Sequence, residues 1–178
     1  MSSCASVEQV WAWLHEIEDP EIPVISIVDL GVVREVQFEG HTCRVAITPT
    51  YSGCPATEVI AQSVRDTLAR HGLSDVRLET RIAPAWTTDW ISDGGRQKLR
   101  AYGIAPPIGL ASEASIRVEE IGRGPVGRAS PDQAPRGLAC PQCGSTRVAI
   151  ISQFGSTPCK ALARCSDCAE PFDYFKCH

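Results

Sequence analysis

The arrangement of cysteines constrains this chain more than any other feature. Four of its nine cysteines form two Cys-x-x-Cys pairs, Cys140 with Cys143 and Cys165 with Cys168, with 21 residues between the pairs. Each pair can wrap a tight turn around a metal ion, and a hairpin between them can bring both turns together. We predict that the four thiolates hold one structural metal ion. Zinc is preferred, and iron or an Fe-S cluster, which uses the same ligands, is the alternative.

The sequence around these cysteines predicts a small module. Two strand-like segments, VAIIS at 148–152 and ALARC at 161–165, flank a turn-rich FGSTP. A module of about 40 residues rarely buries enough apolar surface to fold alone, whereas structural zinc can add about 10–16 kcal/mol. Residues 138–178 are therefore expected to form a zinc-ribbon-like module that its metal stabilises. Cys159, Cys177 and His178 are left over, and we expect them to pack or lie at the surface as additional thiols and a terminal imidazole.

The first hundred residues have the pattern of a small α+β domain. Segments with helical or strand periodicity follow one another in the order α-β-β-α-β-α, at residues 6–17, 32–38, 43–47, 55–72, 76–82 and 92–102. Ser6 and Gln9 have the spacing of a capping box, and Pro55 fits the first position of the second helix. We predict a domain at 1–103, a Pro/Gly-rich linker at 104–137 and the ribbon at 138–178.

Composition excludes several classes of function. The formal net charge is −4, and a nucleic-acid-binding surface would need a denser basic patch than this sequence offers. No segment approaches the roughly 20 apolar residues of a membrane span, and the start of the chain lacks the pattern of an export signal. We expect a cytoplasmic protein that binds neither nucleic acid nor membrane.

One cysteine outside the ribbon has the setting of a reactive thiol. Cys54 lies in YSGCPA, directly ahead of the second predicted helix, where unpaired amides and the helix dipole favour a thiolate. Such a thiol suits transient binding of a soft metal or cluster, although a weak helix cap explains the position equally well. Asp29 can lie nearby as an oxygen ligand or proton acceptor, or simply form a turn. Trp86, Asp89 and Trp90 form either a contact surface or, for the indoles, part of the core.

Two runs resemble a known family. DPEIPVISIVDLGVV at 19–33 and TPTYSGCPAT at 48–57 resemble the small α+β domain of iron-sulfur maturation proteins. With PAWTTDWIS, GIAPP, CPQCGS, FGSTPCKALARC and EPFDYFKC added, the whole chain is similar to the D-subunit family of multicomponent phenylacetyl-CoA epoxidases. In the maturation family the cysteine that matches Cys54 is the functional one, and the aspartate that matches Asp29 belongs to the same signature.

The resemblance implies a setting in bacterial phenylacetate degradation. There a di-iron oxygenase epoxidises the ring of phenylacetyl-CoA, and a flavin and Fe-S reductase supplies electrons. The implied role is an accessory one, assisting insertion of iron or an Fe-S cluster into either component, and a homodimer is compatible with it. No catalytic motif of a stand-alone enzyme is present, so no catalytic residue is predicted.

Two other interpretations remain open. A direct subunit of the epoxidase could carry electrons through an iron-bound tail, and a zinc-ribbon adaptor could dock other macromolecules without delivering metal. The identity of the metal in the tail distinguishes the electron-transfer interpretation from the maturation role, because bound iron absorbs visible light and bound zinc does not. The reactivity of Cys54 distinguishes the adaptor interpretation from the maturation role, because an adaptor needs no reactive thiol.

Overall fold

The computed structural model describes residues 5–51, 53–108, 134–135 and 137–176. The chain divides into two compact units, the first made of residues up to Trp86 together with Trp90–Gly95, and the second made of Thr87–Asp89 and the residues from Arg96 on. Within the described residues, no helix is long and apolar enough to cross a membrane.

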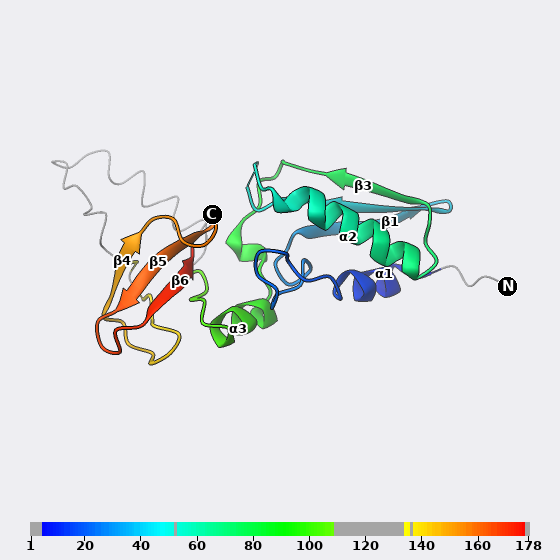
Figure 1. Ribbon diagram of the computed structural model, residues 1–178. Helices are drawn as coiled ribbons and strands as arrows, with labels where there is room; N and C mark the ends of the chain where they lie inside the picture. Colours follow the sequence, from blue (N-terminus) through cyan, green and yellow to red (C-terminus); the bar gives the residue numbers. More distant parts are fainter. Residues whose placement is uncertain (1–4, 52, 109–133, 136, 177–178) are drawn as a thin grey trace. The chain divides into compact units, whose positions relative to one another are not determined.

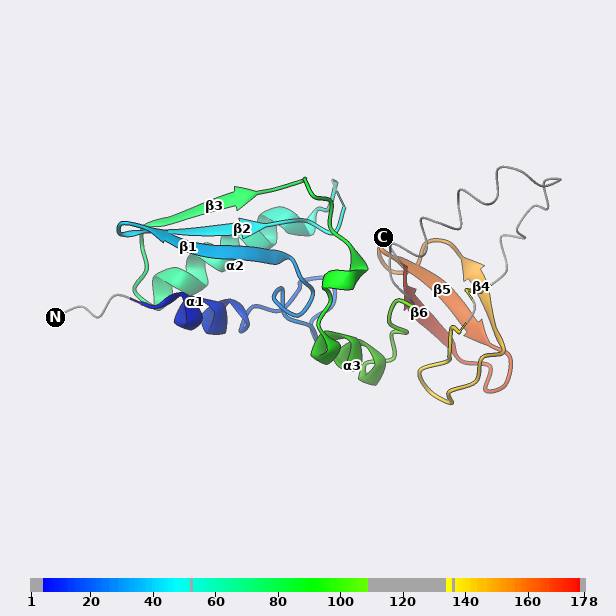
Figure 2. The same cartoon turned by 180° about the vertical axis from the view of Figure 1, so that it is seen from behind.

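The first unit is a three-stranded sheet with two helices. Its elements follow the order α1 (Val7–Leu14), β1 (Val33–Glu39), β2 (Thr42–Ile47), α2 (Ala56–Arg70) and β3 (Val76–Thr80). Strand β2 is central and pairs antiparallel with β1 and parallel with β3. Figures 1 and 2 show α1 and α2 on one face of this sheet, with α2 crossing between β2 and β3 as the parallel connection requires.

Local sequence explains where the two helices begin. Ser6 accepts a hydrogen bond from the backbone of Gln9, and the Gln9 side chain accepts one from the backbone of Ser6, so the predicted capping box is present. Pro55 precedes the first residue of α2, where its missing N–H has no cost and its fixed φ favours the helix. Both starts are therefore encoded within a few residues.

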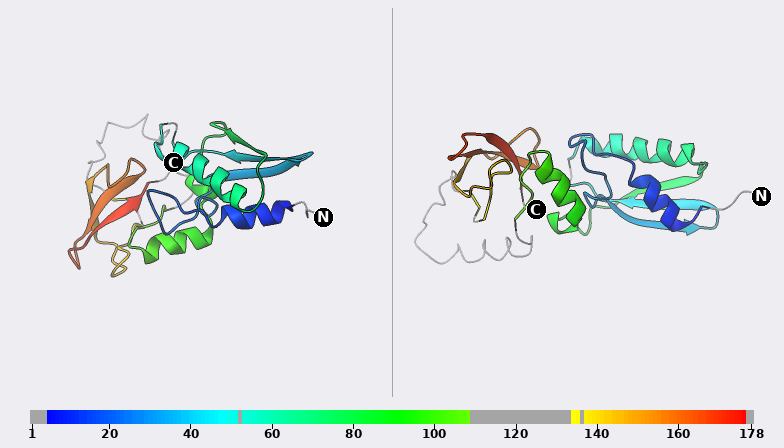
Figure 3. Two further views of the ribbon diagram at one scale, coloured as in Figure 1. Left: turned by 45° about the vertical axis from the view of Figure 1, so that its right-hand side comes forward. Right: turned by 90° about the horizontal axis from the view of Figure 1, so that it is seen from below.

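The two faces of the sheet differ in chemistry. The helices cover an apolar face, and the shared core contains Val10, Leu14, Val36, Cys43, Val45, Ile47, Ile60, Val64 and Leu68. On the opposite face, Arg44 pairs with Glu39 and Glu79, and Arg81 pairs with Glu35 and Glu79. Figure 3 shows this second face without a helix over it. Alternation along the strands thus separates a hydrophobic layer from a network of ion pairs.

The second unit contains an antiparallel ribbon. Its strands are β4 (Val148–Ser152), β5 (Lys160–Cys165) and β6 (Pro171–Phe175), in the order β4-β5-β6. The sequence analysis predicted β4 and β5 but assigned no strand to the third segment. Its period-two pattern was the available signal, because Phe172 and Tyr174 point inward and are buried.

Residues just after α3 (Asp93–Ala101) belong with this ribbon. Ala105 forms a parallel bridge with Tyr174, its N–H donates to the carbonyl of Asp173 at 2.8 Å, and its carbonyl accepts from Phe175 at 2.9 Å. Paired backbone is therefore present at residue 105, within the segment predicted as the linker. A Pro/Gly-rich composition indicates irregular backbone, and irregular backbone can still pair with a strand. The rest of the predicted linker lies largely outside the described residues.

The fold class predicted from the sequence is confirmed. The chain combines an α-β-β-α-β-α order with a C-terminal ribbon. The exact domain boundaries stay a prediction.

Candidate metal centre and thiol site

The four paired cysteines come together at one end of the ribbon. The Sγ atoms of Cys140, Cys143, Cys165 and Cys168 all lie within 4.8 Å of one another. Cys165 ends β5, and the other three lie in the turns that flank the sheet. Cys140 and Cys165 are buried, whereas Cys143 and Cys168 are exposed, so the cluster lies at the edge of the ribbon.

The sulfur spacing fits a tetrahedral metal site. Cys140 Sγ is 3.7 Å from Cys168 Sγ, and Cys143 Sγ is 3.6 Å from Cys165 Sγ. A tetrahedron with Zn–S bonds of about 2.3 Å places sulfur atoms about 3.8 Å apart, while a disulfide joins them at about 2.0 Å. The thiols are thus arranged for one shared ion and not for disulfides. Their role as ligands remains the prediction made above.

The two Cys-x-x-Cys turns have matching backbone geometry. In the first, Gly144 follows the second cysteine with φ +74°, and its N–H donates to the carbonyl of Cys140 at 2.9 Å. In the second, Ala169 occupies the equivalent position with φ +62°. A positive φ is easy for glycine and costs an alanine about 1 kcal/mol. The second turn is therefore held in its shape by the surrounding contacts.

Asp167 connects the two turns. It lies between Cys165 and Cys168, and its carboxylate accepts from Ser145 Oγ and pairs with Arg147, both of which follow the first turn. Its backbone N–H also donates to Cys165 Sγ at 3.4 Å. Donors around a ligand sulfur stabilise the thiolate and fix its direction. The sequence analysis missed these supporting residues, although an aspartate inside the second pair was a visible signal.

The electrostatics of the cluster favour one thiolate before any metal binds. The pKa of Cys165 is lowered to about 7, first by the backbone N–H of Cys168 and then by the neighbouring thiols. Burial opposes this shift. A thiol that loses its proton near neutral pH is a competent first ligand, because the thiolate is the form that binds metal.

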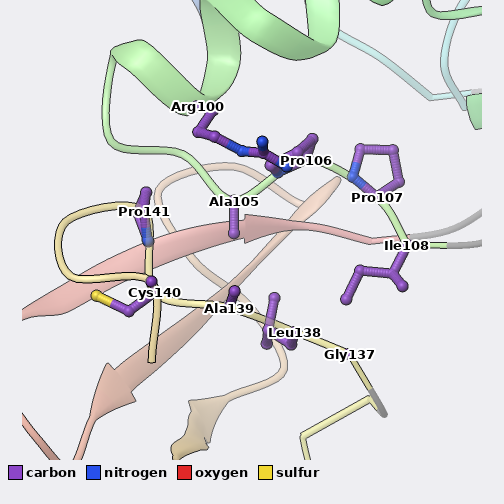
Figure 4. A pocket seen from close by; sticks show the side chains of 11 residues that line it. Arg100, Ala105, Pro106, Pro107, Ile108, Gly137, Leu138, Ala139, Cys140 and Pro141 are labelled. Carbon is purple, nitrogen blue, oxygen red and sulfur yellow. The ribbon is translucent and has the colours of Figure 1, made fainter. Parts of the chain in front are cut away.

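A cavity of about 410 Å³ borders the cluster within the second unit. Figure 4 shows its two walls, one formed by Ala105–Ile108 and the other by Leu138–Pro141, with Arg100 near its upper rim. The Cys140 sulfur points away from Pro107 and Ile108 in this view. A candidate ligand residue thus forms part of the cavity lining.

Cys54 is a separate thiol in the first unit. It is free and half-buried, in the irregular chain between β2 and α2. Its N–H donates to the carbonyl of Tyr51 at 3.1 Å, and its carbonyl accepts from Thr57 at 3.2 Å, which is the first turn of α2. The structure therefore places this thiol directly before the helix, as the sequence indicated. Its chemical role is not tested by this geometry.

Asp29 is held by several contacts in the loop before β1. Ser92 Oγ donates to Asp29 Oδ1 at 2.6 Å, and His15 Nε2 lies 3.3 Å from Oδ2. The backbone of Ser92 donates to the carbonyl of Asp29 at 2.8 Å. The carboxylate is thus bound by protein groups that sequence spacing did not reveal. Its predicted role as a ligand or proton acceptor beside Cys54 stays a prediction.

Two glycines allow this close packing. A Cβ on Gly31, whose φ is +74°, would lie 2.6 Å from Trp90 Cβ and from the Trp90 carbonyl oxygen. A Cβ on Gly95 would lie 2.9 Å from Ile25 Cδ1 and 3.0 Å from the carbonyl oxygen of Asp29. The loop around Asp29 and the segment Trp90–Gly95 therefore approach each other more closely than any other residue type permits.

The remaining candidates have different surroundings. Cys159 is buried beside Thr157, whose Oγ1 is 3.0 Å from its sulfur, and Cys177 and His178 lie outside the described residues. Trp86 is buried and donates to the carbonyl of Leu30 at 3.1 Å. Trp90 is partly exposed and stacks against the guanidinium of Arg34, 3.6 Å from the ring centre. One indole thus belongs to the core, and the other lies at the surface.

Comparison with known families separates the same two parts. A sequence model described as the iron-sulfur cluster assembly protein family matches residues 7–77, and one described as the PaaD zinc beta ribbon domain matches residues 125–176. The fold and the sites therefore define a class of protein in which an assembly-type α+β domain is joined to a zinc ribbon.

Individual relatives identify the particular family. The chain is 44% identical over 171 residues to a protein of Escherichia coli (strain K12) that is provisionally named as the D component of the 1,2-phenylacetyl-CoA epoxidase, covering 96% of this chain and 93% of that protein. The chain therefore belongs to the D-subunit family of phenylacetyl-CoA epoxidases.

Shorter relatives match the first part of the chain. The Fe-S protein maturation auxiliary factor YitW of Bacillus subtilis (strain 168) is 32% identical over 87 residues, covering 48% of this chain and 81% of that protein. A conserved hypothetical protein of Thermotoga maritima, known from a solved structure, is 27% identical, covers 56% of this chain and 98% of its own, and has a TM-score of 0.48.

Proposed function

We propose that this protein is an accessory factor of the phenylacetyl-CoA epoxidase system that assists insertion of iron or an Fe-S cluster. The client is either the flavin and Fe-S reductase or the di-iron oxygenase component. Membership of the D-subunit family supports the setting, and the similarity of the first part of the chain to Fe-S maturation factors supports the role. The protein acts on its partners and carries no catalytic site of its own.

The observation that carries this proposal is the setting of Cys54. Its thiol is free, only half-buried and placed directly before α2, in the part of the chain that matches the assembly family. A soft sulfur ligand on a short irregular segment can bind iron or a cluster and release it again, because one ligand holds the cargo weakly. Asp29 belongs to the same family signature, and in our proposal it supports the site by fixing the loop before β1 through its contacts with Ser92 and His15.

The ribbon has a different role in this account. Four thiolates at tetrahedral spacing satisfy zinc completely and leave no open coordination position. In this account the bound ion stabilises the folded tail, and the four cysteines hold the ion permanently. We assign Cys140, Cys143, Cys165 and Cys168 to that structural site and the cargo to Cys54.

Replacing Cys54 by serine tests the proposal. A hydroxyl before a helix caps as well as a thiol, so the free energy of unfolding should change by less than about 1 kcal/mol. Iron and acid-labile sulfide should be measured on the reductase and oxygenase purified from cells that make only the variant. We expect the client component to contain less iron and acid-labile sulfide than it does in wild-type cells, and we expect poor growth on phenylacetate. Cys4→Ser, the same exchange ahead of α1 in the sequence, is the matched control.

Normal metal content in the Cys54→Ser strain would remove Cys54 from the mechanism. A deficit that also appears with Cys4→Ser would indicate a general effect of thiol loss and would not support transfer through Cys54.

A second candidate function is favoured by the sulfur cluster itself. Four thiolates within 4.8 Å of one another suit iron as well as zinc, and an iron-bound tail could carry electrons within the epoxidase. Purified protein with a visible absorption band and one iron per chain would favour this electron-transfer role. A colourless protein with one zinc would exclude it.

The expected partners are proteins. The acidic balance of the chain disfavours nucleic acid, and we place the protein in the cytoplasm with its clients. Association of two copies through the first unit is compatible with the proposal and is not required by it.

A further inference from the structure

Trp86 connects two loops of the first unit that are distant in sequence. It follows β3, is 4% exposed, and donates its indole N–H to the carbonyl of Leu30 at 3.1 Å. Leu30 directly follows Asp29 in the loop that leads into β1. One edge of the indole is thus fixed to that loop by a buried hydrogen bond.

The same indole borders the chain that leads to Cys54. Trp86 lines a cavity of about 190 Å³ together with Thr48–Tyr51, Ile82 and Ala85. The N–H of Thr48 donates to the carbonyl of Val32 at 2.8 Å. Between that bond and α2, the described residues form no helix or strand. The course of this chain therefore depends on what it packs against.

A thiol that transfers metal must present its sulfur in a fixed direction. Displacement of a reacting group by about 1 Å can lower a rate about 10²-fold. Directly before Cys54 the backbone makes a short turn, closed by the hydrogen bond from the Cys54 N–H to the carbonyl of Tyr51. Trp86 is buried and lines the same cavity as Tyr51, so its fixed indole bounds the space into which this segment can move.

We propose that Trp86 is a positioning residue for Cys54. Its N–H anchors it to Leu30, and its ring restrains Thr48–Tyr51, so the Cys54 thiol is held in one place without touching Trp86. The purpose of this restraint rests on the proposed transfer function. The restraint itself can be measured without any client.

Alkylation of single cysteines tests this in the full, metal-loaded chain. Wild type and Trp86→Phe are treated with iodoacetamide, and the labelling of Cys54 and Cys43 is followed by mass spectrometry of their peptides. Phenylalanine keeps a ring and removes the N–H, so the chain before Cys54 should open more often and Cys54 should react about two- to tenfold faster. Cys43 is fully buried in β2 and reports on unfolding of the unit, so it should stay protected.

Trp13→Phe is the matched control. Trp13 stacks on His71, with ring centres 4.4 Å apart, and its exchange should leave the Cys54 rate unchanged. An unchanged Cys54 rate in Trp86→Phe would overturn the proposal. Labelling of Cys43 together with Cys54 would also overturn it, because Trp86 would then be only a core residue. Failure of Cys54→Ser to impair metal delivery would refute the proposed function and leave this result standing.

Discussion

Loss of one ligand should remove the metal and unfold the ribbon. Cys143→Ser is the cleanest change, because the Cys143 side chain is exposed and contributes little apart from its sulfur. Cys140 and Cys165, by contrast, belong to the buried core, so their exchange would combine lost packing with lost ligation.

The size of the effect follows from the geometry of the cluster. Two of the sulfur pairs lie at nearly equal distances, 3.7 and 3.6 Å, so we assign each of the four predicted ligands an equal share of the binding energy. Structural zinc contributes about 10–16 kcal/mol, and one quarter of that is about 2.5–4 kcal/mol, or about 10²- to 10³-fold in affinity. The core beside the cluster is small and includes three alanines, Ala105, Ala161 and Ala163, so it cannot offset this loss.

Competition with a chromophoric chelator gives the zinc affinity, and the NMR spectrum of the full chain shows which unit unfolds. Signals from residues 138–176 should collapse, while those of the first unit remain. Cys159→Ser is the control, since Cys159 is buried in the same module and lies outside the cluster. Wild-type affinity in Cys143→Ser, or a ribbon that stays folded without metal, would refute the four-thiolate site and its role in folding.

Three further outcomes are expected. Gly31→Ala should lower the free energy of unfolding by about 2–4 kcal/mol, because its Cβ would lie 2.6 Å from Trp90 Cβ. Gly40→Ala, at φ +63° with open space around it, is the control and should lower the free energy of unfolding by only about 1 kcal/mol. Similar losses for the two variants in chemical denaturation would contradict the close approach at Gly31. Ala169→Gly should leave the ribbon as stable or raise its melting temperature, because φ there is +62°, and a clear loss of stability would count against strain at that turn. Zinc affinity should fall as the pH is lowered through about 7, the pKa of the Cys165 thiol, because protonation of that thiolate competes with metal binding. Chelator competition at about pH 8 and about pH 6 measures the difference. Equal affinities at the two pH values would argue against thiolate ligands.

Local sequence signals predicted much of the fold because they act over a few residues. The capping box at Ser6 and Gln9 needs only adjacent backbone, and it is present. Pro55 marks the start of α2 for the same reason. The strand periodicity of residues 43–47 likewise predicted β2, in which Cys43, Val45 and Ile47 are buried. Each of these signals depends on properties of neighbouring residues and not on the rest of the chain.

Contacts between distant segments were beyond such signals. The bond from Ser92 to Asp29 spans 63 positions, and the bond from Trp86 to Leu30 spans 56. Ala105 pairs with Tyr174 although its surroundings are rich in proline. The local sequence around either residue does not predict such a pair, because the two residues come into contact only when the chain has folded. The cysteine cluster is different, since the repeated Cys-x-x-Cys spacing itself indicated that distant residues must meet.

The central claim is that the protein prepares its partners and does not take part in their turnover. Oxygenase and reductase that already carry their full complement of iron and clusters should be mixed in vitro without this chain, and the rate of phenylacetyl-CoA epoxidation measured. Our account predicts the same rate as when the chain is added in stoichiometric amount. Fully metallated partners that stay inactive until the chain is added would contradict it and would establish a direct role in the epoxidase itself.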